Sequence, residues 1–185
     1  LHLSIRRQRQ MCIRDSPSVV AVKLGEVPRS VMAAPSLLAG GPVPQHPAEL
    51  ARLPWLALRT FYRDEVCLRH TQTGEVARFD IQPRLSTDGL YALRKAAVLG
   101  LGVGIASAWA LRDELASGQL VLLAPDWQAA PLPVHLVYAP SRLQPARLRR
   151  FIETMREYLP AELCESLKQA KAGADPKART GQKAK

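Results

Sequence analysis

The stretch STDGLYALRKAAVLGLGVGIA, residues 86–106, holds the clearest structural signal in the sequence. It opens on Ser-Thr-Asp, residue types that commonly cap helices, and apolar residues follow at the i, i+3 and i+7 spacing of one buried helix face. Gly100 supplies a residue type that ends helices in the left-handed conformation, and an apolar run comes after it. We therefore expect a helix from residues 86–88 to 99 and a buried strand over 103–106. The buried helix face is expected to consist of Leu90, Leu93 and Ala97.

Short apolar segments separated by turns lie on both sides of this unit. Buried strands are expected from the apolar runs 30–34, 55–58, 119–123 and 134–139. A hairpin is expected from residues 65–69 and 75–79, which flank a loop containing Gly74. Helices are expected over 47–52, 108–116 and 145–159, and a rigid connector at 131–133, where two prolines flank a leucine. Strands that alternate with helices predict an α/β layer architecture.

The positive charge is concentrated at the two ends of the chain. Of the net charge of +10, residues 1–16 carry +3 and residues 166–185 carry +5, which leaves +2 on the body of the 185-residue chain. A basic groove for nucleic acid on the folded part is therefore not expected. Residues 1–16 show no helix or strand period, and we expect a non-native or mistranslated segment there. Residues 161–185 are rich in Lys and Ala and predict a disordered basic tail.

No pattern of catalytic or metal-binding residues stands out. The run from Gly100 to Gly104 departs from the dinucleotide fingerprint G-x-G-x-x-G, because its sixth position is Ile105 and its helix precedes the strand. The glycines are instead expected to end the helix and to allow backbones to pack closely. Three cysteines and four histidines have no metal-ligand spacing. We expect no catalytic residues, no metal site and no cofactor.

Two groups of reactive side chains are expected to be inert. Cys67 falls in the middle of a predicted strand, where a buried thiol is the usual reading. The adjacent acidic pair Asp113-Glu114 is expected to be solvated, as surface carboxylates usually are.

The residues Ser86, Thr87 and Asp88 leave two alternatives open. A helix N-terminus presents free N–H groups and a partial positive charge, which suit a carboxylate or another anion. These three residues are also common helix caps, so capping alone would explain them.

The order of these units resembles the effector-binding (substrate-binding) domain of LysR-type transcriptional regulators. Five segments carry the resemblance: RSVMAAP at 29–35, HPAELA at 46–51, 87–105 from TDG to GLGVGI, LASGQLV at 115–121, and LPVHLVY at 132–138 with residues 147–151. Each motif is short, but all five occur in the family's order and cover about residues 20–159.

The resemblance implies an α/β fold of the two-lobed, type 2 periplasmic-binding-protein-like kind. The second lobe is then expected to be complete, over residues 35–133, and the first lobe partial. Residues 17–34 would end the first lobe and form a crossing strand, and 134–160 would form the return strand and last helix of the first lobe. The family's winged helix-turn-helix has no counterpart in this sequence, so contact with DNA is expected only through a missing N-terminal domain.

The resemblance also implies a function, that of a cytoplasmic, effector-sensing domain. It would bind a small molecule between two lobes to control transcription, as a homo-oligomer when full length and with no membrane contact. An organic acid is suggested as the effector by the helix start alone. The expected effector-binding residues are Ser86, Thr87, Asp88 and Thr60, and the expected hinge residues are Ala34, Pro35, Val137 and Tyr138. The alternatives are the solute-binding protein of a transporter, which has the same fold, and an α/β enzyme, for which a catalytic set is lacking.

Overall fold

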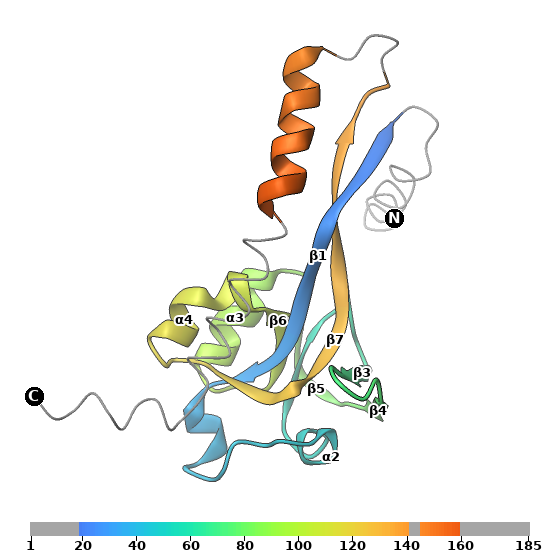
Figure 1. Ribbon diagram of the computed structural model, residues 1–185. Coiled ribbons are helices and arrows are strands. Elements are labelled where there is room, and N and C mark those ends of the chain that lie inside the picture. Colours follow the sequence, from blue (N-terminus) through green and yellow to red (C-terminus); the bar gives the residue numbers. More distant parts are fainter. Residues whose placement is uncertain (1–18, 141–144, 160–185) are drawn as a thin grey trace, which may run out of the picture. The chain divides into compact units, whose positions relative to one another are not determined.

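The computed structural model describes residues 19–140 and 145–159 (Figure 1). These residues divide into two compact units. Unit 1 contains residues 19–26, 133–140 and 145–159, and unit 2 contains Val27–Leu132. The predicted foreign segment 1–16 and the predicted tail 161–185 lie outside the described residues.

Strands β1 (Val20–Ala33) and β7 (Val121–Tyr138) contribute to both units. Unit 1 also contains a helix over residues 146–159, close to the range predicted for it. The other elements of unit 2 are, in chain order, η1 (Pro35–Leu38), α2 (Pro47–Leu50), β2 (Trp55–Leu58), β3 (Glu65–His70), β4 (Val76–Asp80), β5 (Pro83–Thr87), α3 (Leu90–Val98), β6 (Gly104–Ser107), η2 (Ala108–Leu111) and α4 (Arg112–Ala116).

Two sheets organise the strands. The larger has the order β4-β3-β7-β1-β6 (Figure 1). The smaller pairs β2 with β5 in parallel. Strands β3 and β4 form the predicted antiparallel hairpin. A parallel bridge between Trp55 and Val103 gives β2 a second neighbour, the segment that leads into β6. Strands β5, β2 and β6 therefore run in the same direction, and their carboxyl ends share one edge of unit 2, which we call the carboxyl-end edge.

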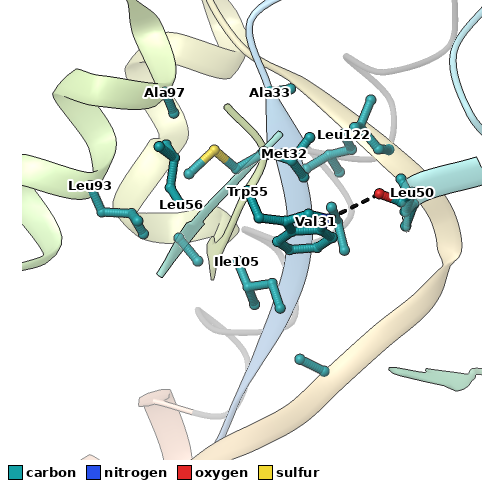
Figure 2. Packing of buried hydrophobic residues seen from close by; sticks show 14 of the residues in the cluster. Val31, Met32, Ala33, Leu50, Trp55, Leu56, Leu93, Ala97, Ile105 and Leu122 are labelled. Atoms are coloured by element: carbon teal, nitrogen blue, oxygen red, sulfur yellow. Dashed lines mark hydrogen bonds between the residues drawn. The ribbon is translucent and has the colours of Figure 1, made fainter. Parts of the chain in front are cut away.

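The core of unit 2 lies around β2, whose four residues are all buried. Figure 2 shows Trp55 surrounded by apolar side chains from β1, α2 and β6, with its indole Nε1–H donating to the Leu50 carbonyl oxygen at 2.9 Å. Gly102 allows the chain to pass close to this core, because an added Cβ there would lie 2.7 Å from the Pro54 carbonyl oxygen. Gly100 ends α3 with φ of +74°, as predicted.

The structure corrects three expectations about local structure. Residues 131–133 are not a connector but part of β7, which continues through both prolines. Helix α3 begins at Leu90, not at 86–88: Ser86 and Thr87 belong to β5, and the N-cap is Gly89 without a side-chain cap. Leu90 is consequently 38% exposed, and the buried face of α3 consists of Leu93, Ala96 and Ala97.

Two side chains expected to be inert also lie differently. Cys67 is exposed, because β3 alternates and turns Val66 and Leu68 inward instead. Glu114 is buried, with only 7% of its surface exposed, and it pairs with Arg94 of α3 at 2.6 Å.

Tyr62 connects the backbones of two neighbouring strands from a buried position. Its hydroxyl donates to the Leu56 carbonyl oxygen at 2.8 Å and accepts from the Ile105 N–H at 2.9 Å. Burial raises the pKa of Tyr62 to about 12, and the Ile105 N–H and the nearby Arg29 charge partly oppose this rise. The phenol therefore stays neutral in the folded chain well beyond the pH at which a free tyrosine ionises.

We expect the free energy of unfolding to fall as the pH rises from 10 towards 12. The unfolded chain releases this proton near pH 10, whereas the folded chain keeps it until about pH 12. The stabilisation present below pH 10 is thus lost as the pH rises through the folded pKa, in total about 3 kcal/mol. Urea unfolding across this range should give a steeper pH dependence for the wild type than for Tyr62→Phe.

The matched control for this measurement is Tyr91→Phe, because Tyr91 is 69% exposed. This variant should keep the wild-type pH dependence. Equal pH dependence in the wild type and in Tyr62→Phe would contradict the role given to the buried hydroxyl.

Candidate functional site

The predicted effector-binding residues come together at the carboxyl-end edge. Strands β2 and β5 pair in parallel up to Leu58 and Thr87, and the Arg59 N–H extends the ladder by donating to the Thr87 carbonyl oxygen at 2.9 Å. Thr60 follows in the turn after β2, and Asp88 follows β5. Residues far apart in the sequence, at 60 and at 86–88, are therefore neighbours in the fold.

The predicted residues differ in how they can meet a ligand. Thr60, Ser86 and Asp88 are exposed, and Thr87 is half-buried. The Thr87 Oγ1 accepts a hydrogen bond from the Gly89 N–H at 3.1 Å, which shapes the turn into α3. Ser86, Thr87 and Asp88 all lie before α3 begins, and none of their side chains caps it. The alternative that these residues serve only as helix caps is therefore wrong.

Arg59 is a residue of this edge that the sequence analysis missed. Its guanidinium holds the Asp88 carboxylate through two hydrogen bonds, Nε to Oδ1 at 3.0 Å and Nη2 to Oδ2 at 2.6 Å. The hydrogen bond and charge of Asp88 raise the pKa of Arg59. A signal was available in its position, since Arg59 directly follows a buried strand and precedes Thr60.

A second arginine, Arg29, reaches the same edge from β1. The antiparallel register of β1 and β6 places Arg29 opposite Ser107, the last residue of β6. Its guanidinium lies 5.1 Å from the centre of the Phe61 ring, and its Nε donates to the Ala130 carbonyl oxygen at 2.7 Å. Burial lowers the pKa of Arg29, partly opposed by its interaction with Tyr62.

The predicted hinge residues lie on or beside the two strands that enter both units. The division between the units falls between Glu26 and Val27 in β1 and between Leu132 and Pro133 in β7. Ala34 and Pro35 therefore lie inside unit 2, and Val137 and Tyr138 lie inside unit 1. The hinge itself remains a prediction.

Residues 19–140 and 145–159 hold no cluster of three or more His, Cys, Asp or Glu side chains placed to bind a metal ion. Within the same ranges, no helix combines the length and the apolar character that crossing a bilayer requires.

A model of the LysR substrate binding domain matches residues 1–160. The HTH-type transcriptional regulator PtxR of Pseudomonas aeruginosa is 31% identical over 149 residues, which are 80% of this chain and 47% of that protein. The HTH-type transcriptional activator AaeR of Escherichia coli K12 is 27% identical over 146 residues, 79% of this chain and 47% of that protein. The chain spans about half the length of the curated relatives it matches.

Solved structures agree with the family match. The full-length Vibrio cholerae virulence activator AphB, a member of the LTTR protein family, superposes with a TM-score of 0.63 at 30% identity and covers 78% of this chain and 49% of its own. The regulatory domain of AphB from Vibrio vulnificus gives a TM-score of 0.62 at 26% identity, over 77% of this chain and 70% of that one. The predicted two-lobed α/β fold is thus confirmed. With a family model matched over most of its length, this chain belongs to the LysR substrate-binding domain family.

Proposed function

We propose that this chain is the effector-sensing domain of a LysR-type transcriptional regulator and that it binds a small molecule at the carboxyl-end edge of unit 2. The observation that carries the proposal is the meeting of Thr60 with Ser86, Thr87 and Asp88 beside two parallel strand ends. Open α/β sheets bind ligands outside the carboxyl ends of their strands. Three of these four residues are exposed, so a ligand has access to them.

We also propose a hinge formed by β1, the residues directly after it, and β7, because both strands contribute to both units. We keep Ala34, Pro35, Val137 and Tyr138 as the proposed hinge residues. An effector that binds one arrangement of the units more tightly than another shifts the population towards that arrangement. In a full-length regulator, this shift would reposition the DNA-binding parts of an oligomer.

The remaining parts of the proposal concern the whole protein. DNA would be contacted through a helix-turn-helix outside this chain, in a cytoplasmic homo-oligomer with no catalytic activity. The names of the relatives support the DNA-binding and regulatory part of this proposal: PtxR is called an HTH-type transcriptional regulator and AaeR an HTH-type transcriptional activator. The alternative, a solute-binding protein of a transporter, is therefore not favoured.

The genomic sequence upstream of the codon for Pro17 tests the regulatory role. We expect the reading frame to continue upstream into a winged helix-turn-helix, with residues 1–16 replaced by sequence of the first lobe. A secretory signal peptide followed by a first lobe would instead favour the transporter component and overturn the proposal.

Replacing Arg59 by alanine should weaken effector binding about tenfold while leaving the free energy of unfolding nearly unchanged. The Arg59–Asp88 pair is exposed, so its loss costs little stability, but it fixes the turn that leads into α3. The measurement is the thermal shift produced by the most stabilising compound from a panel of small acids, amides and sugars.

The matched control is Arg78→Ala, which removes a second exposed ion pair, that of Arg78 with Glu65 in the β3–β4 hairpin. This control should leave the thermal shift unchanged. Two outcomes would count against a binding role for the carboxyl-end edge. Either both variants lose the thermal shift equally, or both keep it.

A further inference from the structure

Granted the proposed function, we infer that the effector carries a carboxylate and that Arg29 is its counter-ion at the carboxyl-end edge. The juxtaposition that carries this inference is a half-buried guanidinium, held by a backbone carbonyl and an aromatic ring, beside Thr60 and the β2 strand end. It locates the anion at a place different from the helix start that the sequence suggested.

The start of α3 already has a carboxylate of its own. Asp88 directly precedes the N-cap residue Gly89, and Arg59 neutralises it through a bidentate contact. A second carboxylate placed there would be repelled by Asp88, and Arg59 would have to exchange one partner for another. The effector's anionic group therefore fits better elsewhere on the edge.

Arg29 offers a cation without such a partner. Among the described residues, its guanidinium makes one hydrogen bond, from Nε to the Ala130 carbonyl oxygen, and no carboxylate lies within ion-pair distance. Phe61 lies against the guanidinium. Burial lowers the pKa of Arg29. A partly desolvated charge without a counter-ion is costly in a fold, and an anionic ligand would offset that cost.

The geometry also indicates what kind of anion fits. Because Nε is bound to Ala130, the two terminal nitrogens remain for a ligand, and a planar guanidinium edge matches a carboxylate with two parallel hydrogen bonds. Phe61 is 50% exposed, so its ring offers apolar surface next to that edge. The chemical class is therefore a small organic acid with an apolar or aromatic body, for which benzoate is the probe.

Arginine side-chain NMR of the full 185-residue chain tests the inference. The hydrogen bond to Ala130 should slow exchange of the Arg29 Nε–H and make its resonance observable. We expect benzoate to shift this resonance in a saturable manner, whereas benzamide, which has the same shape without the charge, should not. The Arg78 Cζ resonance, which does not depend on proton exchange, serves as the internal control, because Arg78 is an exposed arginine that already has a carboxylate partner.

Variants give a second readout by calorimetric titration with benzoate. Arg29→Gln should weaken benzoate binding about tenfold or more, and Arg29→Lys should weaken it less, since it keeps the charge but loses the planar fork. If Arg29→Gln fails to fold, the wild-type NMR titration still decides.

Several outcomes would overturn the assignment of Arg29. These are an Arg29 resonance unmoved by benzoate, equal shifts with benzoate and benzamide, or unweakened binding in Arg29→Gln. A larger shift with inorganic phosphate than with benzoate would overturn the carboxylate class. Binding of neutral compounds at Thr60 and Thr87 without involvement of Arg29 would leave the proposed function standing and reject this inference alone.

Discussion

Replacing Trp55 by alanine should lower the free energy of unfolding by about 3–5 kcal/mol, a large share of the roughly 5–15 kcal/mol that stabilises an ordinary domain. Trp55 is 1% exposed and is among the largest fully buried side chains of the described residues. Its ring packs edge-on against Tyr62 with centroids 6.4 Å apart, and it lies 5.6 Å from the Phe79 centroid. The substitution also leaves the Leu50 carbonyl oxygen without its indole donor. Urea unfolding followed by far-ultraviolet circular dichroism measures the loss.

The control is Trp109→Ala, which removes the same side chain from a site that is 56% exposed on η2. That change should stay within about 0.5 kcal/mol of the wild type. Similar destabilisation by the two substitutions would contradict the placement of the core around β2.

Replacing Glu114 by alanine should lower the free energy of unfolding by about 2 kcal/mol. The carboxylate joins α4 to α3 through Arg94, and its side chain is only 8% exposed. Without the carboxylate, Arg94 lacks its ion-pair partner. The Arg94 side chain is 31% exposed, so water reaches the guanidinium, and the loss of stability is smaller than for a fully buried pair. Chemical unfolding at neutral pH provides the measurement.

Asp113→Ala is the matched control, because Asp113 is the exposed neighbour on the same helix. It should change stability by less than about 0.5 kcal/mol. The double variant Arg94→Met with Glu114→Leu should recover most of the loss, since it removes both charges and keeps apolar volume. If Asp113→Ala and Glu114→Ala lowered the free energy of unfolding equally, the buried Arg94–Glu114 contact would contribute nothing to stability.

Elements with a strong local pattern were predictable from the sequence. Strand β2 has the predicted bounds 55–58, because a continuous apolar run between a proline and a polar turn leaves few alternatives. The β3–β4 hairpin follows from two alternating runs around Gly74, which has φ of +74°. The end of α3 follows from Gly100.

The start of α3 could not be read locally, because a tertiary contact decides it. Ser86 and Thr87 are good helix caps in isolation, but pairing with β2 holds them in β5. That strand has no apolar alternation to reveal it, since three of its five residues are exposed. Tertiary pairing therefore overrode the local preference.

The prediction of a connector at residues 131–133 was wrong for a related reason. Proline usually interrupts a strand because it lacks an N–H donor. The pairing of β3 with β7 runs from Trp127 to Ala129, so Pro131 and Pro133 follow the last residue paired on that side. By contrast, the exposure of Cys67 could have been predicted from the sequence, because Cys67 lies between Val66 and Leu68 in an alternating strand and so faces the opposite side.

The candidate site was predictable in part. Thr60 and residues 86–88 were identified from the sequence and the family resemblance, and they do meet at one edge. Arg29 was missed because its place at the edge follows from the register of β1 with β6, which a single sequence does not display. The position of Arg59 after a buried strand was a signal, but its contact with Asp88 is tertiary and could not be read from the sequence.

Hydrogen–deuterium exchange, with and without the most stabilising compound of the panel, tests the central claim most directly. The first amides of α3 lack helical acceptors and should exchange quickly in the free chain. If the carboxyl-end edge binds the effector, peptides covering residues 59–62 and 86–92 should gain protection while the β3–β4 hairpin is unchanged. Protection confined to the hairpin or to α4, with residues 59–62 and 86–92 unaffected, would contradict an effector site at this edge.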